Sequence, residues 1–120
     1  KSAVNLHASH WLTGFMMDKP LVEVRATLAR LGLARREQSS LVEDHIAALF
    51  ETMRVLIAGQ GARSPASLAE QRAFFDRHLA PWVLRCCVAT SQISVANYYR
   101  RVAQFAYCYM VLERDSLAMD

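Results

Sequence analysis

The chain has 120 residues, of which 53% are hydrophobic and 21% charged, so it can build one folded core and is not a disordered segment. Its four glycines and three prolines are too few for the turns of a many-stranded β-sandwich. The formal net charge is +3, but Lys and Arg are scattered along the chain and match no nucleic-acid-binding motif. Composition therefore favours one helical domain and weighs against a nucleic-acid-binding protein.

The three cysteines indicate free thiols. Cys86 and Cys87 are adjacent, and a disulfide between neighbouring residues is severely strained. With Cys108 the number is odd and no metal-ligand spacing occurs, so a reducing cytoplasm fits best. The longest apolar run, residues 107–112, is too short to span a membrane, and no signal peptide opens the chain. Because the first residue is Lys1, we expect a fragment or a processed product.

Apolar residues at helical spacing predict two helices in the first third of the chain. The first is expected over residues 4–17, with Phe15 and Met16 on its apolar face. Pro20 suits the first turn of the second helix, which runs to Leu31 and ends at a left-handed Gly32.

A polar linker over residues 34–39 precedes the third predicted helix. Ser40 and Glu43 form an S-x-x-E capping box, and the helix is expected over residues 41–58. The glycine-containing stretch 59–65 is predicted to be a loop.

The second half of the chain predicts two or three further helices. Ser67 and Glu70 form another capping box, and Pro81 must end or kink the helix that follows. Helices are then expected over residues 81–90 and 94–114. The predicted architecture is an all-α bundle of five or six helices.

Glu43, Asp44 and His45 place acids beside an imidazole where the third helix is expected to begin. One interpretation is structural: Glu43 caps the helix, Asp44 offsets the helix dipole and His45 lies at the core margin. The other is that the cluster binds an arginine or another ligand through charge-assisted hydrogen bonds. The residues alone favour the structural interpretation.

A second cluster, residues 74–82 (FFDRHLAPW), combines aromatic side chains at helical spacing with His78 and a Pro-Trp step. Such spacing is more typical of a core than of a ligand pocket, and a hydrogen-bonded core histidine is the simpler explanation of His78. Trp82 needs a partner for its indole N–H, and beside the kink at Pro81 it could line a groove.

Enzymatic motifs are missing from the sequence. No H-E-x-x-H, nucleophile elbow or glycine-rich phosphate loop occurs. His7 and His10 are three residues apart, but two further metal ligands at a recognised spacing are lacking. We expect no enzyme, no metal and no cofactor. A small metal-dependent or acid–base enzyme using Asp44, His45 and His78 is the weaker alternative.

Four segments resemble, in the same order, motifs of the TorD/DmsD family of redox-enzyme maturation chaperones. Residues 9–14 (SHWLTG) are similar to S-x-Y-L-T-G, 42–45 (VEDH) to E-P-x-D-H, 74–82 to F-x-x-H-L-x-P-W, and 98–99 (YY) to an aromatic-Tyr pair. The chain departs from the family at Leu41 and Val42, where Glu-Pro is frequent, and the family is usually longer at its N-terminus.

The resemblance implies one all-helical chaperone-like domain over residues 1–120 that lacks an N-terminal portion of the family fold. Helix exchange with another protomer could complete it as a homodimer. It also implies a cytoplasmic chaperone, without a cofactor, for a molybdenum-cofactor oxidoreductase of the dimethyl sulfoxide reductase type. Its partner would be the apo catalytic subunit, held by its twin-arginine leader peptide or its mature part until cofactor insertion, which prevents premature export. Some relatives bind guanine nucleotide, but no phosphate loop occurs here.

For this role, carboxylates would bind the leader's arginines and apolar side chains its hydrophobic segment. The expected client-binding residues are Trp11, Leu12, Glu43, Asp44, His45, Phe75, His78, Pro81, Trp82 and Tyr99. Within binding proteins, the alternative is a generic helical adaptor whose apolar groove serves another partner.

Overall fold

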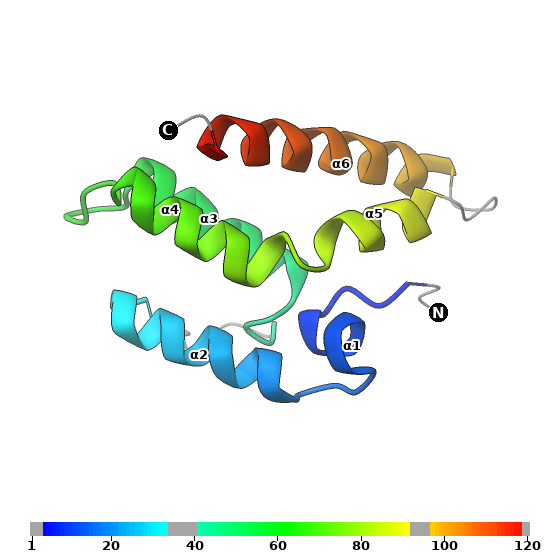
Figure 1. The fold of residues 1–120 in the computed structure, drawn as a ribbon, viewed down its shortest axis with the longest axis horizontal. Helices are drawn as coiled ribbons and strands as arrows, with labels where there is room; N and C mark the ends of the chain where they lie inside the picture. Colours follow the sequence, from blue (N-terminus) through cyan, green and yellow to red (C-terminus); the bar gives the residue numbers. More distant parts are fainter. Residues whose placement is uncertain (1–3, 34–40, 92–96, 119–120) are drawn as a thin grey trace.

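The computed structural model describes residues 4–33, 41–91 and 97–118, and only the backbone at residues 91 and 97–105. Over these ranges it contains α-helices, one π-helical turn and no β-strand, so the predicted all-α fold is confirmed (Figure 1). The elements are α1 (Ala8–Thr13), α2 (Lys19–Leu31), α3 (Ile46–Ala58), α4 (Leu68–Phe74), the π turn η1 (Phe75–Leu79), α5 (Val83–Ser91) and α6 (Asn97–Ala118).

The helices form three layers (Figure 1). α3, α4 and α5 lie in the middle layer, α6 covers one side of it, and α1 and α2 cover the other. α6 packs mainly on α5 and also on α4, whereas α1 packs on α2. The starts of α1 and α3 lie together, because the Ala8 N–H donates to the Asp44 carbonyl at 3.0 Å.

Both predicted ends of α2 are confirmed. The Asp18 side chain accepts a hydrogen bond from the Lys19 N–H at 2.8 Å, and Pro20 lies in the first turn. Gly32 ends the helix in the left-handed region (φ 74°), where its N–H donates to the carbonyls of Ala29 and Leu28. Local signals fix this helix because each acts within one turn of its end.

The first helix is shorter than its apolar spacing predicted. It begins at Ala8 instead of residue 4, and it ends at Thr13 because Gly14 adopts a left-handed C-cap (φ 86°). Residues 4–7 are not helical, since their backbone pairs with the start of α3: the Ile46 N–H donates to the Leu6 carbonyl at 2.8 Å. The predicted helix included Phe15 and Met16, but both lie beyond the end of α1 and are exposed.

The predicted start of the third helix is also wrong. α3 begins at Ile46 instead of residue 41, and His45 is its N-cap, with Nδ1 accepting from the Ala47 N–H at 3.0 Å. Glu43 forms an ion pair with Arg25 instead of capping the helix. The pairing of residues 44–46 with the N-terminal segment holds this stretch out of helical geometry. The predicted linker 34–39 and Ser40 lie outside the described residues.

The remaining helix ends follow the predictions more closely. Ser67 caps α4 by accepting from the Glu70 N–H at 3.1 Å, and residues 59–65 join α3 to α4 without helix. α5 begins at Val83, just after the expected Pro81. α6 extends to Ala118, beyond the predicted end at residue 114, and the predicted start at 94 lies outside the described residues.

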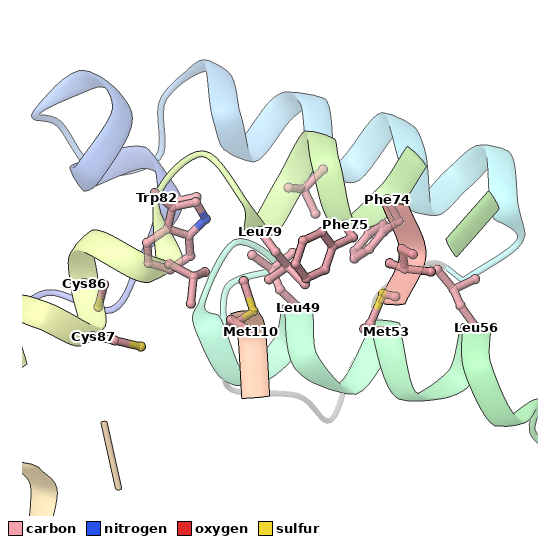
Figure 2. Close-up of a cluster of buried hydrophobic side chains, with 14 of the residues drawn as sticks. Leu49, Met53, Leu56, Phe74, Phe75, Leu79, Trp82, Cys86, Cys87 and Met110 are labelled. Atoms are coloured by element: carbon pink, nitrogen blue, oxygen red, sulfur yellow. The ribbon is translucent and has the colours of Figure 1, made fainter. Parts of the chain in front are cut away.

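The core joins the middle layer to α2 and α6. Buried side chains from α3, α4, η1, α5 and α6 interdigitate in Figure 2, among them Leu49, Met53, Phe74, Phe75, Leu79, Trp82 and Met110. Cys86 and Cys87 are buried free thiols and Cys108 is an exposed one. No helix in the described part of the chain is long and apolar enough to cross a membrane.

Candidate functional site

Asp44 holds the start of α1 against the start of α3. Its side chain is fully buried, at 0% exposed. Its backbone carbonyl accepts from the Ala8 N–H at 3.0 Å, and its Oδ2 accepts from the Ser9 N–H at 2.8 Å. These donors belong to the first turn of α1, where a helix lacks internal acceptors. Asp44 therefore caps α1 from across the fold, and it lies just before α3 and not inside it.

The same junction reaches α2. Ser9 is completely buried, and its Oγ accepts from the N–H of Asp18, the N-cap of α2, at 3.2 Å. Asp44 Oδ1 is buried and has no hydrogen-bond partner among the described residues. Three helix starts are thus tied together by Asp44, Ser9 and Asp18, and Asp44 has no surface with which to contact a partner directly.

His45 joins this junction from the solvent side. Its ring lies edge-on to that of His7, with 4.9 Å between centroids, and the two residues form an isolated antiparallel β-bridge. Partial burial lowers the pKa of His45, repulsion from His7 lowers it further, and the neighbouring Asp44 carboxylate partly offsets both effects. His7 is fixed on its other side, where its Nδ1 lies 3.1 Å from Asn5 Oδ1.

Glu43 already has an arginine partner in its own chain. Its carboxylate lies 3.1 Å from Arg25 Nε, and the two side chains are 10% and 48% exposed. Glu43 is thus a carboxylate positioned for guanidinium binding, and another arginine would have to displace Arg25.

His78 is a core histidine with its hydrogen bonds satisfied. It lies on the π turn, with Nε2 2.8 Å from Thr27 Oγ1 and its ring 4.9 Å from that of Phe74. Its carbonyl accepts from the Trp82 indole N–H at 2.8 Å. Burial, with a smaller contribution from Arg77, lowers the pKa of His78 to about 4. The structural interpretation of His78 holds in this structure.

The aromatic residues divide between core and surface. Phe75 and Trp82 are at most 1% exposed, so they do not line a surface groove here. Trp11 is half-buried and, with Leu84, Val88 and Tyr107, lines a shallow groove of about 350 Å³.

Three other expected site residues remain: Leu12, Pro81 and Tyr99. Leu12 and Pro81 are exposed. The Arg85 guanidinium lies 5.8 Å from the centre of the Trp11 ring. The side chain of Tyr99 is outside the described part of the structure.

Apolar side chains are exposed around the turn between α1 and α2, and of these only Leu12 was expected from the sequence to bind a client. The five side chains, here called the α1–α2 apolar patch, are between 41% and 70% exposed: Leu12, Phe15, Met16, Met17 and Val22. The signal that could have found it is the pair of helix-ending and helix-starting residues, Gly14 and Asp18, which leaves residues 15–17 in a turn. Met17 adopts a positive φ of 54° in this turn.

Within the described ranges, no three His, Cys, Asp or Glu side chains gather as a metal site requires. Asp44 and His45 serve the α1–α3 junction, whereas His78 bonds to α2. The proposed acid–base trio therefore has separate structural partners.

The family comparison gives the decisive observation: the model of the nitrate reductase delta subunit matches residues 1–88. The chain belongs to the nitrate reductase delta subunit family. This family, also called NarJ, is a member of the TorD/DmsD superfamily of maturation chaperones, so the resemblance seen in the motifs is confirmed. Searches of curated proteins and of solved structures each found no match.

Membership in the nitrate reductase delta subunit family has two consequences. Proteins of this family are chaperones of molybdoenzyme assembly and have no catalytic activity. The family also implies binding to the catalytic subunit of nitrate reductase. The junction of Asp44, His45 and Ser9 lies within the matched residues, and α6 lies outside them.

Proposed function

We propose that this chain is a cytoplasmic chaperone for the apo catalytic subunit of a nitrate reductase, a molybdoenzyme of the dimethyl sulfoxide reductase type. It holds the subunit by its twin-arginine leader, its mature part or both, assists cofactor insertion and prevents premature export. Family membership over residues 1–88 supports the client class. The contact site rests on one observation, the α1–α2 apolar patch next to a carboxylate-bearing junction.

The patch suits the hydrophobic segment of a leader peptide. Exposed Met and Phe side chains on a short turn adapt their shape to an apolar partner. Burying each of a few such side chains contributes roughly 1.5–3 kcal/mol, which is enough for micromolar affinity after the costs of association. Trp11, also on α1, lines a shallow groove with Leu84, Val88 and Tyr107 that offers further apolar surface.

Glu43 is the proposed partner of a leader arginine. The incoming guanidinium would exchange with Arg25, which is half exposed and held at 3.1 Å. In this proposal Trp11, Leu12, Glu43, His45, Pro81 and Tyr99 contact the client. The buried members, Asp44, Phe75, His78 and Trp82, support the surface by fixing α1 and the π turn.

Calorimetric titration with a twin-arginine leader peptide tests the proposal. We expect micromolar binding that is lost when both arginines are changed to alanine. Equal binding of the altered leader and of unrelated apolar peptides would instead support the generic adaptor. No binding to any leader, together with no binding to the apo catalytic subunit, would contradict the chaperone proposal.

Phe15→Ser provides the sharper test of where the leader binds. Phe15 is 70% exposed, so its loss leaves the core intact and removes apolar contact area from the patch. We expect leader affinity to fall about tenfold, since one buried aromatic contact is worth well over 1 kcal/mol.

The matched control is Leu112→Ser, because Leu112 is also 70% exposed but lies on α6. The two variants should have wild-type helicity by circular dichroism. Equal affinity losses in both would contradict the assignment of the patch as the binding surface.

A further inference from the structure

The cap of α3 depends on an unprotonated nitrogen. Most N-caps are hydroxyl, amide or carboxylate side chains, which accept a hydrogen bond at neutral and mildly acidic pH. Here the acceptor is His45 Nδ1, 3.0 Å from the Ala47 nitrogen. An imidazole nitrogen accepts only while it carries no proton, so His45 must hold its proton on Nε2.

Protonation of His45 would destabilise the observed geometry in three ways. Nδ1 would become a donor facing the Ala47 N–H, so the cap would be lost. A cation would also lie at the positive end of the α3 dipole. Finally, His7 lies edge-on at 4.9 Å, and repulsion from it disfavours a positive charge on His45.

The charged groups around His45 do not cancel these costs. The Asp44 carboxylate favours the protonated form, but its Oδ2 is already engaged by the Ser9 N–H. Glu43 is paired with Arg25, which reaches the junction from α2. Burial and His7 outweigh Asp44, so the pKa of His45 lies below its ordinary value of 6.5.

Loss of the cap would also weaken the docking of α1, because the backbone beside His45 is hydrogen-bonded to the N-terminal segment. Residues on both sides of His45 carry the hydrogen bonds that dock the N-terminal segment: the Ile46 N–H to the Leu6 carbonyl at 2.8 Å, and the Ala8 N–H to the Asp44 carbonyl at 3.0 Å. Trp11 reports on this segment, because its indole N–H donates to the Asn5 carbonyl at 2.7 Å.

We propose that His45 is a proton-sensitive latch: neutral, it caps α3 and keeps residues 4–7 and α1 docked, and protonated, it releases them while the core stays folded. The proposal concerns the fold of the free chain and does not require that a client binds. Failure of the leader-binding experiment would therefore leave it intact.

Nuclear magnetic resonance titration of the 120-residue chain from pH 7.5 to pH 5 tests the latch. The chain has two tryptophans, so the two indole N–H signals separate the junction (Trp11) from the core (Trp82). We expect the Trp11 indole and the Ser9 and Ile46 amides to shift together with one midpoint below the ordinary histidine value of 6.5. The Trp82 indole should stay unchanged over this range, because it bonds to the His78 carbonyl in the core.

His45→Asn is the matched variant, since asparagine is a good N-cap that takes up no proton. We expect its junction signals at pH 7.5 to match wild type and to show no midpoint down to pH 5. A midpoint that persists in His45→Asn, or a wild-type chain without one, overturns the proposal.

A direct measurement covers the case in which the variant does not dock at neutral pH. The ¹⁵N shifts of the His45 ring in the wild-type chain report which nitrogen carries the proton. A proton on Nδ1 at pH 7.5, or a ring that titrates without any change at the Ala47 amide, would overturn the latch.

Discussion

At the residue scale, burial is the main cause of the lowered pKa of two histidines, but their other contacts differ. His78 is 4% exposed and bonds to Thr27. His45 is only partly buried, and after burial its neutral form is favoured by His7 and by the cap it provides to α3. Acid should therefore act first on the junction and later on the core.

We predict that His78 makes the free energy of unfolding depend on acid pH. Its folded pKa of about 4 lies below the ordinary 6.5, so the unfolded chain binds more protons and stability falls as pH drops through this window. The full loss is roughly 3 kcal/mol, reached below pH 4. Urea unfolding at pH 7 and pH 4.5 should show most of it in wild type and little of it in His78→Gln. All other titratable groups are the same in both proteins, so equal losses would contradict the prediction.

At the element scale, the sequence predicted the helix ends that are set by nearby residues, such as those of α2. It did not predict the start of α3, which is set by contacts with residues far away in the sequence. Pro20 and Gly32 lie at the two ends of α2 as expected, because each acts on its own turn. The S-x-x-E pattern at Ser40 and Glu43 failed because residues 44–46 pair with a segment about forty positions earlier, and backbone pairing leaves no mark in side-chain patterns. Asp44 was found from sequence as a notable residue, but its role as the cap of another helix required the fold.

Ser67 offers a test of a predicted cap. Its Oγ accepts from the Glu70 N–H at 3.1 Å, while the Glu70 carboxylate lies 3.4 Å from Arg30. Ser67→Ala should lower the free energy of unfolding by about 1 kcal/mol, and Ser67→Asp should preserve it. Chemical denaturation measures both. Ser64→Ala, in the exposed loop before the helix, is the control, and an equal loss there would argue against the cap.

At the scale of the whole molecule, composition and periodicity predicted the all-α fold. They did not predict which surface would stay uncovered: Phe15 and Met16 had helical spacing but lie in a turn after Gly14. The aromatic cluster 74–82 was correctly favoured as core, and its Phe74, Phe75 and Trp82 are buried in the group of side chains drawn in Figure 2. The uncovered patch could not be predicted because burial depends on packing between layers.

Arg72 links α4, in the middle layer, to α6, which covers it. Arg72 on α4 donates from Nε and Nη2 to the Leu117 carbonyl near the end of α6, at 3.0 and 2.7 Å. Arg72→Lys removes this fork, so we expect the last turn of α6 to fray and stability to fall by about 0.5–1.5 kcal/mol. Amide hydrogen exchange in residues 115–118 measures the fraying. Arg54→Lys, which alters an exposed pair with Glu51, is the control and should leave that exchange rate unchanged.

The π turn at Phe75–Leu79 affects how this chain should be aligned with related chains. Its Ala80 N–H donates to the Phe75 carbonyl, five residues back, so the turn holds one residue more than an α-helical turn would. Each residue of an α-helix advances by about 100°, so this extra residue rotates everything after it by the same angle relative to α4. A relative with a continuous α-helix here would match the spatial positions of this chain only across a one-residue gap between Phe74 and Pro81. Beyond that gap, the two chains should be aligned by the hydrogen bond from the Trp82 indole N–H to the His78 carbonyl and not by counting residues from α4.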